Sequence, residues 1–344
     1  MVDRASAEHA PNDNAIMTHP LTAVQPISEV PPKTSDLLSE VIAGLSSSTP
    51  TLPCKYFYDE RGAALFQKIC ELPEYYITRT EIDILEQHSA EIASQLGPNI
   101  ELIGLGTGAG TKTRILIEAL DKPAVYIPVD ISEKQLRKST ASFRKILPDL
   151  EILPVCADYL QPVVLPTPRR QPARNVVYFP GSTLGNFEPY EALEFLRRIA
   201  NVSCQGGGGL LIGVDLQKDQ DIIETAYNDS AGVTAQFNLN LLARLNREIG
   251  TDFDLNQWRH RAIYNSAAGR IEMYLISATD QIVHVGNREF RFRAGEKILT
   301  EHSYKHTQEG FIALARQAGF EFVKLWTDDA RLFGIFYFGC GRDQ

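Results

Sequence analysis

The feature that most constrains the fold is an alternation of apolar, strand-like runs with amphipathic helical segments across residues 100–216. The strand-like runs are residues 100–106, 124–130, 151–158, 175–181 and 209–216. Helical patterns fill three of the gaps, at residues 111–120, 132–147 and 190–200. Apolar strands that alternate with helices predict an α/β fold with a doubly wound parallel sheet. Ligands bind such sheets beyond the carboxyl ends of the strands, so residues there are the first candidates for a site.

The end of the chain departs from this pattern. A helical segment at residues 311–319 precedes two strand-like runs, FEFVKLWTD and LFGIFYFGC, which are joined only by Asp-Ala-Arg. So short a link makes a hairpin, and the last strand must therefore be antiparallel. A parallel sheet that ends in one antiparallel strand is similar to the sheet of class I S-adenosylmethionine-dependent methyltransferases, which have a Rossmann-like fold.

Composition shifts divide the chain further. About ninety residues before the final helix contain a helical stretch and then short alternating strands separated by turns, which predicts a smaller α+β lobe that covers the substrate. We expect the following divisions: a disordered tail at 1–33, an N-terminal helical part of the substrate lobe at 34–80, the core at 81–217, the inserted lobe at 218–307, and the C-terminal part of the core at 308–344.

Bulk properties exclude some partners. The net charge of −9 argues against binding to a nucleic-acid backbone, which requires a basic face. We see neither an apolar run of membrane-spanning length nor a signal peptide, so we expect no membrane partner. The five cysteines are scattered without a CxxC pair, which suggests free thiols in a reducing compartment. A monomeric cytoplasmic protein with a small-molecule substrate is the expectation.

The glycine-rich segment after the first strand suggests a nucleotide. GTGAGTKT nearly matches a phosphate-binding loop, but Thr111 precedes Lys112 where that loop has glycine. GLGTGA also matches the weak dinucleotide pattern G-x-G-x-x-A, and a plain strand-to-helix turn is a third alternative. Glycines at 104, 106, 108 and 110 permit a close approach of the backbone to a ligand.

Two further strand ends help to choose among these ligands. Asp130 follows Gly106 by 24 residues, near the usual spacing of a carboxylate that binds ribose hydroxyls. Asp158 and Tyr159 end the next run and could bind an adenine amine and ring. The alternatives are a helix cap for Asp130 and a loop residue for Asp158. Together the three strand ends specify an adenosine without a pyrophosphate, which favours S-adenosylmethionine over NAD.

The fourth strand ends in FPGSTLGNFEP. Asn186 in this segment could bind an amine or a carboxylate through its amide, or it could belong to an ordinary Gly/Asn turn.

Several blocks then resemble one family. KYFYDERGAALFQKICELPEYYITRTEIDIL at residues 55–85 resembles the N-terminal signature of the histidine Nα-methyltransferases of the ergothioneine pathway. LGTGAGTKTRIL, VDIS, CADY, FPGSTLGNFEP, TAYNDSAGVTAQFN and TEHSYK follow in that family's order. The resemblance implies an enzyme that uses S-adenosyl-L-methionine to convert L-histidine to its trimethylammonium betaine, hercynine, in three methylations.

The resemblance also implies roles for individual residues. The cofactor would be bound by Tyr58, Gly106, Lys112, Asp130, Asp158 and Tyr159. Asn186 and Tyr227 would hold the backbone groups of the amino acid, and Asn186 and Tyr58 would contact the reacting groups. Tyr75, Glu301 and Ser303 would face the imidazole, with Met273 in the same pocket.

The residue types suit this chemistry. Glu301 and Ser303 are two apart, so on a strand they share one face, where a carboxylate and a hydroxyl suit a ring N–H. The alternative for Glu301 is a surface ion pair with Lys297 or Lys305. The rings of Tyr58 and Tyr75 could stabilise a cationic sulfonium or ammonium, or simply pack in the core.

One residue departs from the family pattern. Gly104 stands where the family usually has an acid at the end of the first strand, and Glu101 or a water is the candidate replacement. One alternative function is methylation of another aromatic amino acid such as tryptophan, since few residues set the specificity. The other is a catalytically silent homologue, which Gly104 favours. His302 and His306 are spaced i, i+4, but methyl transfer to an amine needs no metal, and none is expected.

Overall fold

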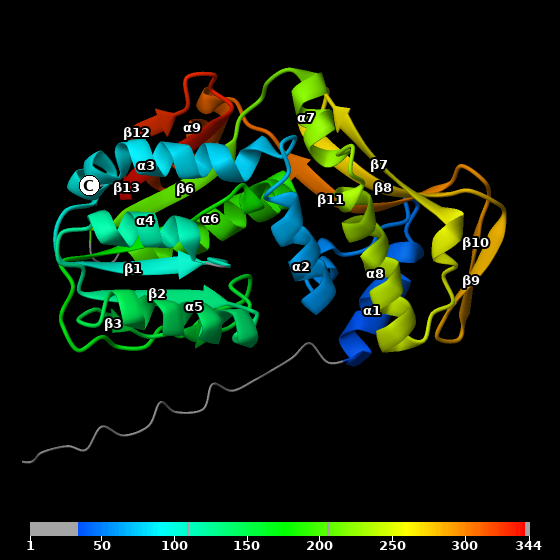
Figure 1. Cartoon of the computed structure of the whole chain (residues 1–344), viewed down its shortest axis with the longest axis horizontal. Helices are drawn as coiled ribbons and strands as arrows, with labels where there is room; N and C mark the ends of the chain where they lie inside the picture. Colours follow the sequence, from blue (N-terminus) through cyan, green and yellow to red (C-terminus); the bar gives the residue numbers. More distant parts are fainter. Residues whose placement is uncertain (1–33, 109, 205–206, 341–344) are drawn as a thin grey trace, which may run out of the picture.

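A mixed, mostly parallel sheet forms the core of one half of the molecule, on the left in Figure 1. The computed structural model describes residues 34–108, 110–204 and 207–340, so the expected tail at 1–33 lies outside the described residues. The strands of this sheet are β1 (Ile100–Leu105), β2 (Val125–Asp130), β3 (Glu151–Ile152), β4 (Val155–Cys156), β5 (Arg174–Phe179), β6 (Gly209–Asp215), β12 (Phe320–Thr327) and β13 (Phe333–Cys340). Their order is β12-β13-β6-β5-β1-β2-β3, and β4 also pairs with β2.

The strand directions confirm the predicted fold class. Strands β2, β1, β5 and β6 are parallel neighbours, whereas β13 runs antiparallel to both β6 and β12. The predicted run at 151–158 is two short strands, β3 and β4, because Pro154 between them has no N–H for the ladder.

Helices cover both faces of the sheet. On one face lie α3 (Tyr76–Leu96), α4 (Thr111–Ala119) and α5 (Glu133–Ile146), and on the other α6 (Pro189–Ser203) and α9 (Gln308–Gln317). Successive residues of β1 enter different cores: Leu102 packs with residues of α3 and α4, and Ile103 packs with residues of α6 and α9. This alternation is the period of two expected of a strand buried on both faces.

The second lobe is a smaller α+β unit beside the sheet (Figure 1). Its inserted part contains α7 (Gln220–Tyr227), α8 (Val233–Ile249), η4 (Leu255–Gln257), β7 (Trp258–Asn265), β8 (Arg270–Ser277), β9 (Gln281–Val285), β10 (Arg288–Phe292) and β11 (Lys297–Tyr304). The segments α1 (Thr34–Leu45), η1 (Cys54–Phe57) and α2 (Glu60–Ile69) pack against it. The order β11-β8-β7 is antiparallel throughout, as the alternating pattern predicted.

One expected boundary changes at the start of α3. This helix begins at Tyr76 and buries Thr80 in its second turn. The expected division between residues 80 and 81 therefore falls inside a continuous helix. Because α3 packs on α4, β12 and β13, it lies with the sheet along its whole length.

The cysteine prediction is partly wrong. Cys204, which caps α6, forms a disulfide with Cys340 at the end of β13, whereas Cys54 and Cys70 carry free thiols. The two bonded residues are 136 positions apart, and only the sheet brings their Cα atoms to 5.3 Å.

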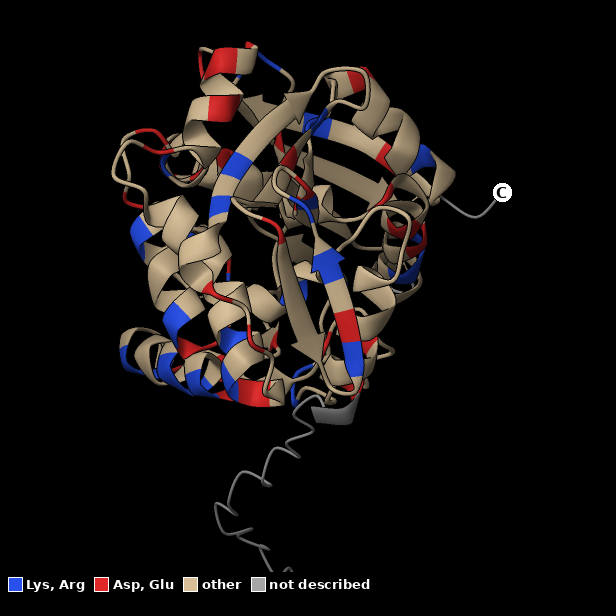
Figure 2. Cartoon of the chain, turned by 90° about the vertical axis from the view of Figure 1, so that its right-hand side faces the viewer, with Lys and Arg blue, Asp and Glu red and all other residues tan. Residues whose placement is uncertain are grey.

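Surface charge and helix character add two observations. Lys and Arg positions are interspersed with Asp and Glu positions on the face seen in Figure 2. Strand β10 contains both signs, in Arg288, Glu289 and Arg291. Among the described helices, none has both the length and the apolar character that a membrane span requires.

Candidate active site

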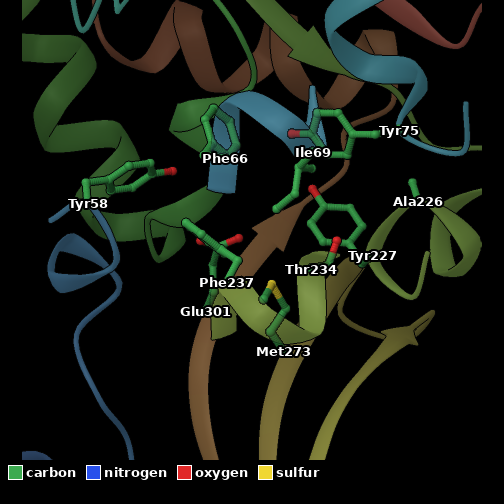
Figure 3. A pocket seen from close by; sticks show the side chains of 10 residues that line it. All are labelled: Tyr58, Phe66, Ile69, Tyr75, Ala226, Tyr227, Thr234, Phe237, Met273 and Glu301. Atoms are coloured by element: carbon green, nitrogen blue, oxygen red, sulfur yellow. The ribbon is translucent and has the colours of Figure 1, made fainter. Parts of the chain in front are cut away.

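A cavity in the second lobe brings together five residues that the sequence singled out: Tyr58, Tyr75, Tyr227, Met273 and Glu301. Its remaining walls are Phe66, Ile69, Ala226, Thr234 and Phe237. Figure 3 shows the hydroxyls of the three tyrosines and the Glu301 carboxylate directed toward the same space. The cavity is therefore aromatic and apolar with a few convergent polar groups, which is typical of a site for a small ligand.

Glu301 supplies the carboxylate of this cavity. It lies on β11 just after a register shift at Leu299, and it pairs with Met273 of β8, so the two side chains are cross-strand neighbours. Burial raises the pKa of Glu301 from 4.5 to about 7, although the nearby Lys305 ammonium opposes the rise. The surface ion pair considered for Glu301 does not form, because Lys297 lies over the Tyr274 ring and Lys305 is fully buried beside Asp215.

Ser303 belongs to a polar cluster at the edge of the cavity. Its hydroxyl lies 2.9 Å from that of Tyr227, and Lys305 Nζ donates to both, at 2.8 and 2.9 Å. The same ammonium lies 2.7 Å from Asp215 Oδ2. Burial disfavours the charged form of Lys305, but Asp215 and Tyr227 outweigh it, and the pKa of Lys305 is raised.

The glycine loop connects β1 to α4. Gly106, Gly108 and Gly110 have φ values of 58°, 53° and 81°. This left-handed conformation is strained for residues that carry a Cβ, whereas glycine adopts it readily. A Cβ at Gly106 would lie 3.3 Å from the Tyr159 ring, whereas one at Gly108 would meet nothing within 4 Å. The loop thus presents open backbone on one side and a tyrosine on the other, a cradle for a ligand.

The two aspartates after β2 and β4 have local partners as well. Asp130 accepts hydrogen bonds from the N–H groups of Ser132 at 2.9 Å and of Gly108 at 3.4 Å, so it joins the glycine loop to the start of α5. Burial raises the pKa of Asp130. Asp158 accepts from the N–H of Leu160 at 2.8 Å, which is the loop role considered for it. Both residues lie at the predicted edge of the sheet.

Lys112 does not project freely from the first turn of α4. Its ammonium lies 2.6 Å from the carboxylate of Glu81 on α3, and that carboxylate also accepts from the N–H of Gly181 at 2.9 Å. The ion pair fixes Lys112 between the glycine loop and the segment that follows β5.

Asn186 ends the short helix η2 (Thr183–Asn186) in that segment. Its neighbour Gly185 lies so close to β11 that a Cβ there would be 2.7 Å from the carbonyl oxygen of Tyr304. Ser182 accepts a hydrogen bond from the N–H of Asp215 at 3.0 Å. Close packing therefore holds the Asn186 segment between β11 and the end of β6.

Tyr58 connects the two halves of the site. Its ring is 45% exposed although it lines the cavity, and it lies within electrostatic reach of both Glu301 and Tyr159.

Other candidates fall outside the site. His302 pairs with Glu188 at 2.9 Å, and His306 packs on Phe311, so the two histidines do not meet. The described residues contain no cluster of three or more ligating side chains that could hold a metal. Glu101 is the second residue of β1, near the end of the strand that is remote from the glycine loop, and it cannot replace an acid at Gly104.

Sequence reasoning missed Glu81, Asp215 and Lys305. Asp215 ends a strand of the sheet, which is the signal that identified Asp130 and could have identified it too. Glu81 lies among the buried apolar residues of α3, and a charge on the buried face of a helix is a usable signal.

The family described as "Histidine-specific methyltransferase, SAM-dependent" matches residues 37–340. The chain belongs to this family. A histidine N-alpha-methyltransferase of Mycolicibacterium smegmatis is 42% identical over 87% of this chain and 93% of its own length. Ergothioneine biosynthesis protein 1 of Schizosaccharomyces pombe is 30% identical over 79% of this chain and 36% of its length.

A solved structure of a possible exported protein from Bordetella parapertussis is 10% identical, with a TM-score of 0.50 over 89% of this chain and 87% of that one, which shows a shared fold alone. As a member of the histidine-specific methyltransferase family, the chain is a methyltransferase that uses S-adenosylmethionine. The residues at the glycine loop fit this cofactor. The left-handed glycines leave room for a ligand beside the Tyr159 ring, and the buried Asp130 carboxylate lies at the loop.

Proposed function

We propose that this methyltransferase converts L-histidine to Nα,Nα,Nα-trimethylhistidine, hercynine, by three successive methyl transfers. The observation that carries the proposal is the position of Glu301 in an otherwise aromatic and apolar cavity, next to the Ser303 and Tyr227 hydroxyls. A carboxylate and a hydroxyl in such surroundings suit the two nitrogens of an imidazole. The names of the family and of its relatives support the same substrate.

Each part of the substrate has a proposed partner. Glu301 and Ser303 hold the imidazole ring, and Tyr75 and Met273 form the walls around it. Asn186 and Tyr227 hold the amino and carboxylate groups. Tyr58, at the boundary of the two halves, orients the amine and offers its ring to the cationic groups.

The cofactor would be held by Tyr58, Gly106, Lys112, Asp130, Asp158 and Tyr159. S-adenosylmethionine supplies an activated methyl group on a sulfonium when it is bound. Lys112 acts here mainly through its ion pair with Glu81, which keeps the glycine loop against the Gly181 segment.

The main contribution of the protein to catalysis is to align the reacting groups. Holding an amine in line with its reaction partner can lower a barrier by several kcal/mol. The amine must be unprotonated to react, and an α-amino group in a peptide titrates near pH 8, about 7.7–8.0. The rate should therefore rise with pH through the neutral range, and a flat profile would contradict this role for the amine.

Incubation with S-adenosylmethionine and a mixture of all amino acids, followed by mass spectrometry, tests the proposal. Histidine carrying one, two and three added methyl groups is the expected product set. Methylated tryptophan would instead identify the alternative substrate, and the absence of any methylated product together with no binding of S-adenosylmethionine would identify a silent homologue.

The remaining proposals concern the protein as a whole. We propose that the enzyme is a monomer, and sedimentation would test this. We propose that α1, η1 and α2 belong to the substrate lobe together with residues 218–307. A cytoplasmic location stays a prediction.

A further inference from the structure

The buried cluster of Lys305, Ser303, Tyr227 and Asp215 is more elaborate than substrate contact alone requires. Lys305 is 2% exposed and Ser303 is 2% exposed. Burying an ammonium is costly unless every proton finds an acceptor. Because this buried cluster lies at the edge of the cavity, we expect it to affect how the ligand is bound.

The hydrogen bonds of the cluster can be counted. An ammonium has three N–H donors, and those of Lys305 are taken by Asp215 Oδ2, Tyr227 Oη and Ser303 Oγ. Both hydroxyl oxygens therefore accept from Lys305. The two hydroxyls lie 2.9 Å apart, so one of them donates to the other, and one O–H proton is left over.

Chemistry decides which proton is left over. A phenol is the stronger donor and the weaker acceptor of the two hydroxyls, so Tyr227 donates to Ser303. Ser303 then accepts from both Lys305 and Tyr227, and both of its lone pairs are occupied. Its own O–H is the remaining donor, and Ser303 lies on the same face of β11 as Glu301.

We propose that Lys305 is a positioning residue that makes Ser303 an obligate hydrogen-bond donor. The pocket then binds a neutral imidazole in a single tautomer, with its N–H toward Glu301 and its unprotonated nitrogen toward Ser303. The inference rests on the proposed function and deepens it. An imidazolium would direct its second N–H at Ser303 Oγ, whose two lone pairs already accept hydrogen bonds from Lys305 and Tyr227, and it would therefore bind poorly.

The surroundings of Lys305 keep it charged. The groups that face it are Asp215 of β6, Tyr227 of α7, Tyr264 of β7, Glu301 and Ser303 of β11, His306, and Lys218, which shares Asp215 with it. Burial lowers the pKa of His306 to about 4, so His306 stays neutral near pH 6. Burial also lowers the pKa of Lys218 to about 8. The Lys218 ammonium donates to Asp215 and to the Tyr76 hydroxyl, and not to the hydroxyls of Ser303 or Tyr227.

The first test uses the unchanged protein. Calorimetry compares histidine with 3-(pyrrol-2-yl)alanine and 3-(pyrrol-3-yl)alanine, whose ring N–H matches one imidazole nitrogen or the other while the acceptor nitrogen is missing. Each pyrrole should bind at least roughly tenfold more weakly than histidine, because the Ser303 O–H is left unpaired. In Ser303→Ala the gap to the better pyrrole should close to within about threefold. Equal affinity of the unchanged protein for histidine and either pyrrole would overturn the inference.

The second test measures how many protons are released when histidine binds. Histidine binding is measured without a methyl donor at pH 6.0, in buffers of different ionisation enthalpy, for the unchanged protein, Lys305→Met and the matched control Lys218→Met. With a pKa of about 6.5, roughly three quarters of free imidazole carries its extra proton at that pH. The unchanged protein and Lys218→Met should release this proton on binding. Lys305→Met frees a lone pair on Ser303, so release should fall by about half a proton or more per histidine.

A purely electrostatic effect has the opposite sign. Lys305 lowers the pKa of Glu301, so its loss leaves more proton on Glu301 in the free variant and would increase the release on binding. Unchanged or increased release in Lys305→Met would overturn the inference, as would an equal fall in Lys218→Met. If Lys305→Met does not fold, the comparison with the pyrroles decides. A complete lack of histidine binding by the unchanged protein would overturn the proposed function itself.

Discussion

The Lys112 ammonium lies 2.6 Å from Oε2 of Glu81, on a carboxylate that also accepts the N–H of Gly181. Glu81 comes from α3, Lys112 from the helix after the glycine loop, and Gly181 from the segment after β5. One buried carboxylate thus ties together two loops at the carboxyl edge of the sheet. Glu81 thereby places a buried negative charge at this edge from α3, and the Lys112 ammonium neutralises it.

We predict that Glu81→Ala destabilises the protein by about 2–4 kcal/mol, because it leaves the Gly181 N–H and the Lys112 ammonium without their buried partner. Glu81→Gln should cost less than half as much, since its amide oxygen still accepts from Gly181. Urea unfolding measures both. The control is Glu60→Ala, which removes an equally short ion pair with Lys134 that is exposed to solvent, and this change should cost far less than Glu81→Ala. Equal losses for the two alanine variants would contradict the prediction.

The space around Gly104 has no room for a side chain. A Cβ there would lie 2.6 Å from Cγ2 of Thr107 and 3.1 Å from the Tyr126 ring. We expect Gly104→Ala to lower the free energy of unfolding by about 1–3 kcal/mol through overpacking, and Gly104→Asp to cost more. Thr107→Ser removes the clashing methyl but keeps the hydroxyl, so the double variant should recover much of the loss. Thermal unfolding would show this, and a neutral Gly104→Ala would refute it.

Asp130→Ala should weaken binding of S-adenosylmethionine by roughly 10- to 100-fold, as expected for the loss of hydrogen bonds to a charged group. Isothermal calorimetry without substrate provides the measurement. Asp149→Ala removes an exposed carboxylate shortly after α5 and should leave the affinity unchanged. Unaltered affinity in Asp130→Ala would limit that residue to its bonds with Ser132 and Gly108.

Glu301→Ala should reduce the affinity for histidine at least roughly tenfold, because the ring N–H loses a charged acceptor, while affinity for S-adenosylmethionine stays within about twofold. The two affinities are measured separately by calorimetry. If histidine turnover survives the change intact, the role of Glu301 toward the imidazole is wrong.

Glu301 should also make stability depend on pH. Its pKa is about 7 in the folded protein and 4.5 is its ordinary value, so the folded state holds the proton more tightly. As the pH rises above 4.5 the unfolded state loses the proton first, and stability falls until about pH 7. The difference corresponds to at most about 3 kcal/mol.

Glu301→Gln removes this penalty. We expect the variant to match the parent near pH 4.5 and to be more stable at pH 8, as determined by thermal unfolding at both values. Glu321→Gln, an exposed carboxylate on β12, is the control and should show no such trend. A stability difference that does not change between the two pH values would show that Glu301 is not the titrating group.

The sequence by itself determined the sheet and the polar ends of its strands. Apolar runs of strand length must be buried on both faces, and a three-residue link permits only a hairpin, so β1, β2, β5, β6 and the antiparallel β13 followed from local patterns. The gathering of Tyr58, Tyr75, Tyr227, Met273 and Glu301 in one cavity followed only from resemblance, because four separate segments supply them. Tertiary structure alone decided the partners: Glu81 with Lys112, Cys204 with Cys340, and Lys305 with Asp215 and Tyr227. Such pairs depend on distances between segments far apart in the chain, and a one-dimensional pattern carries no information about those distances until the sheet order is fixed.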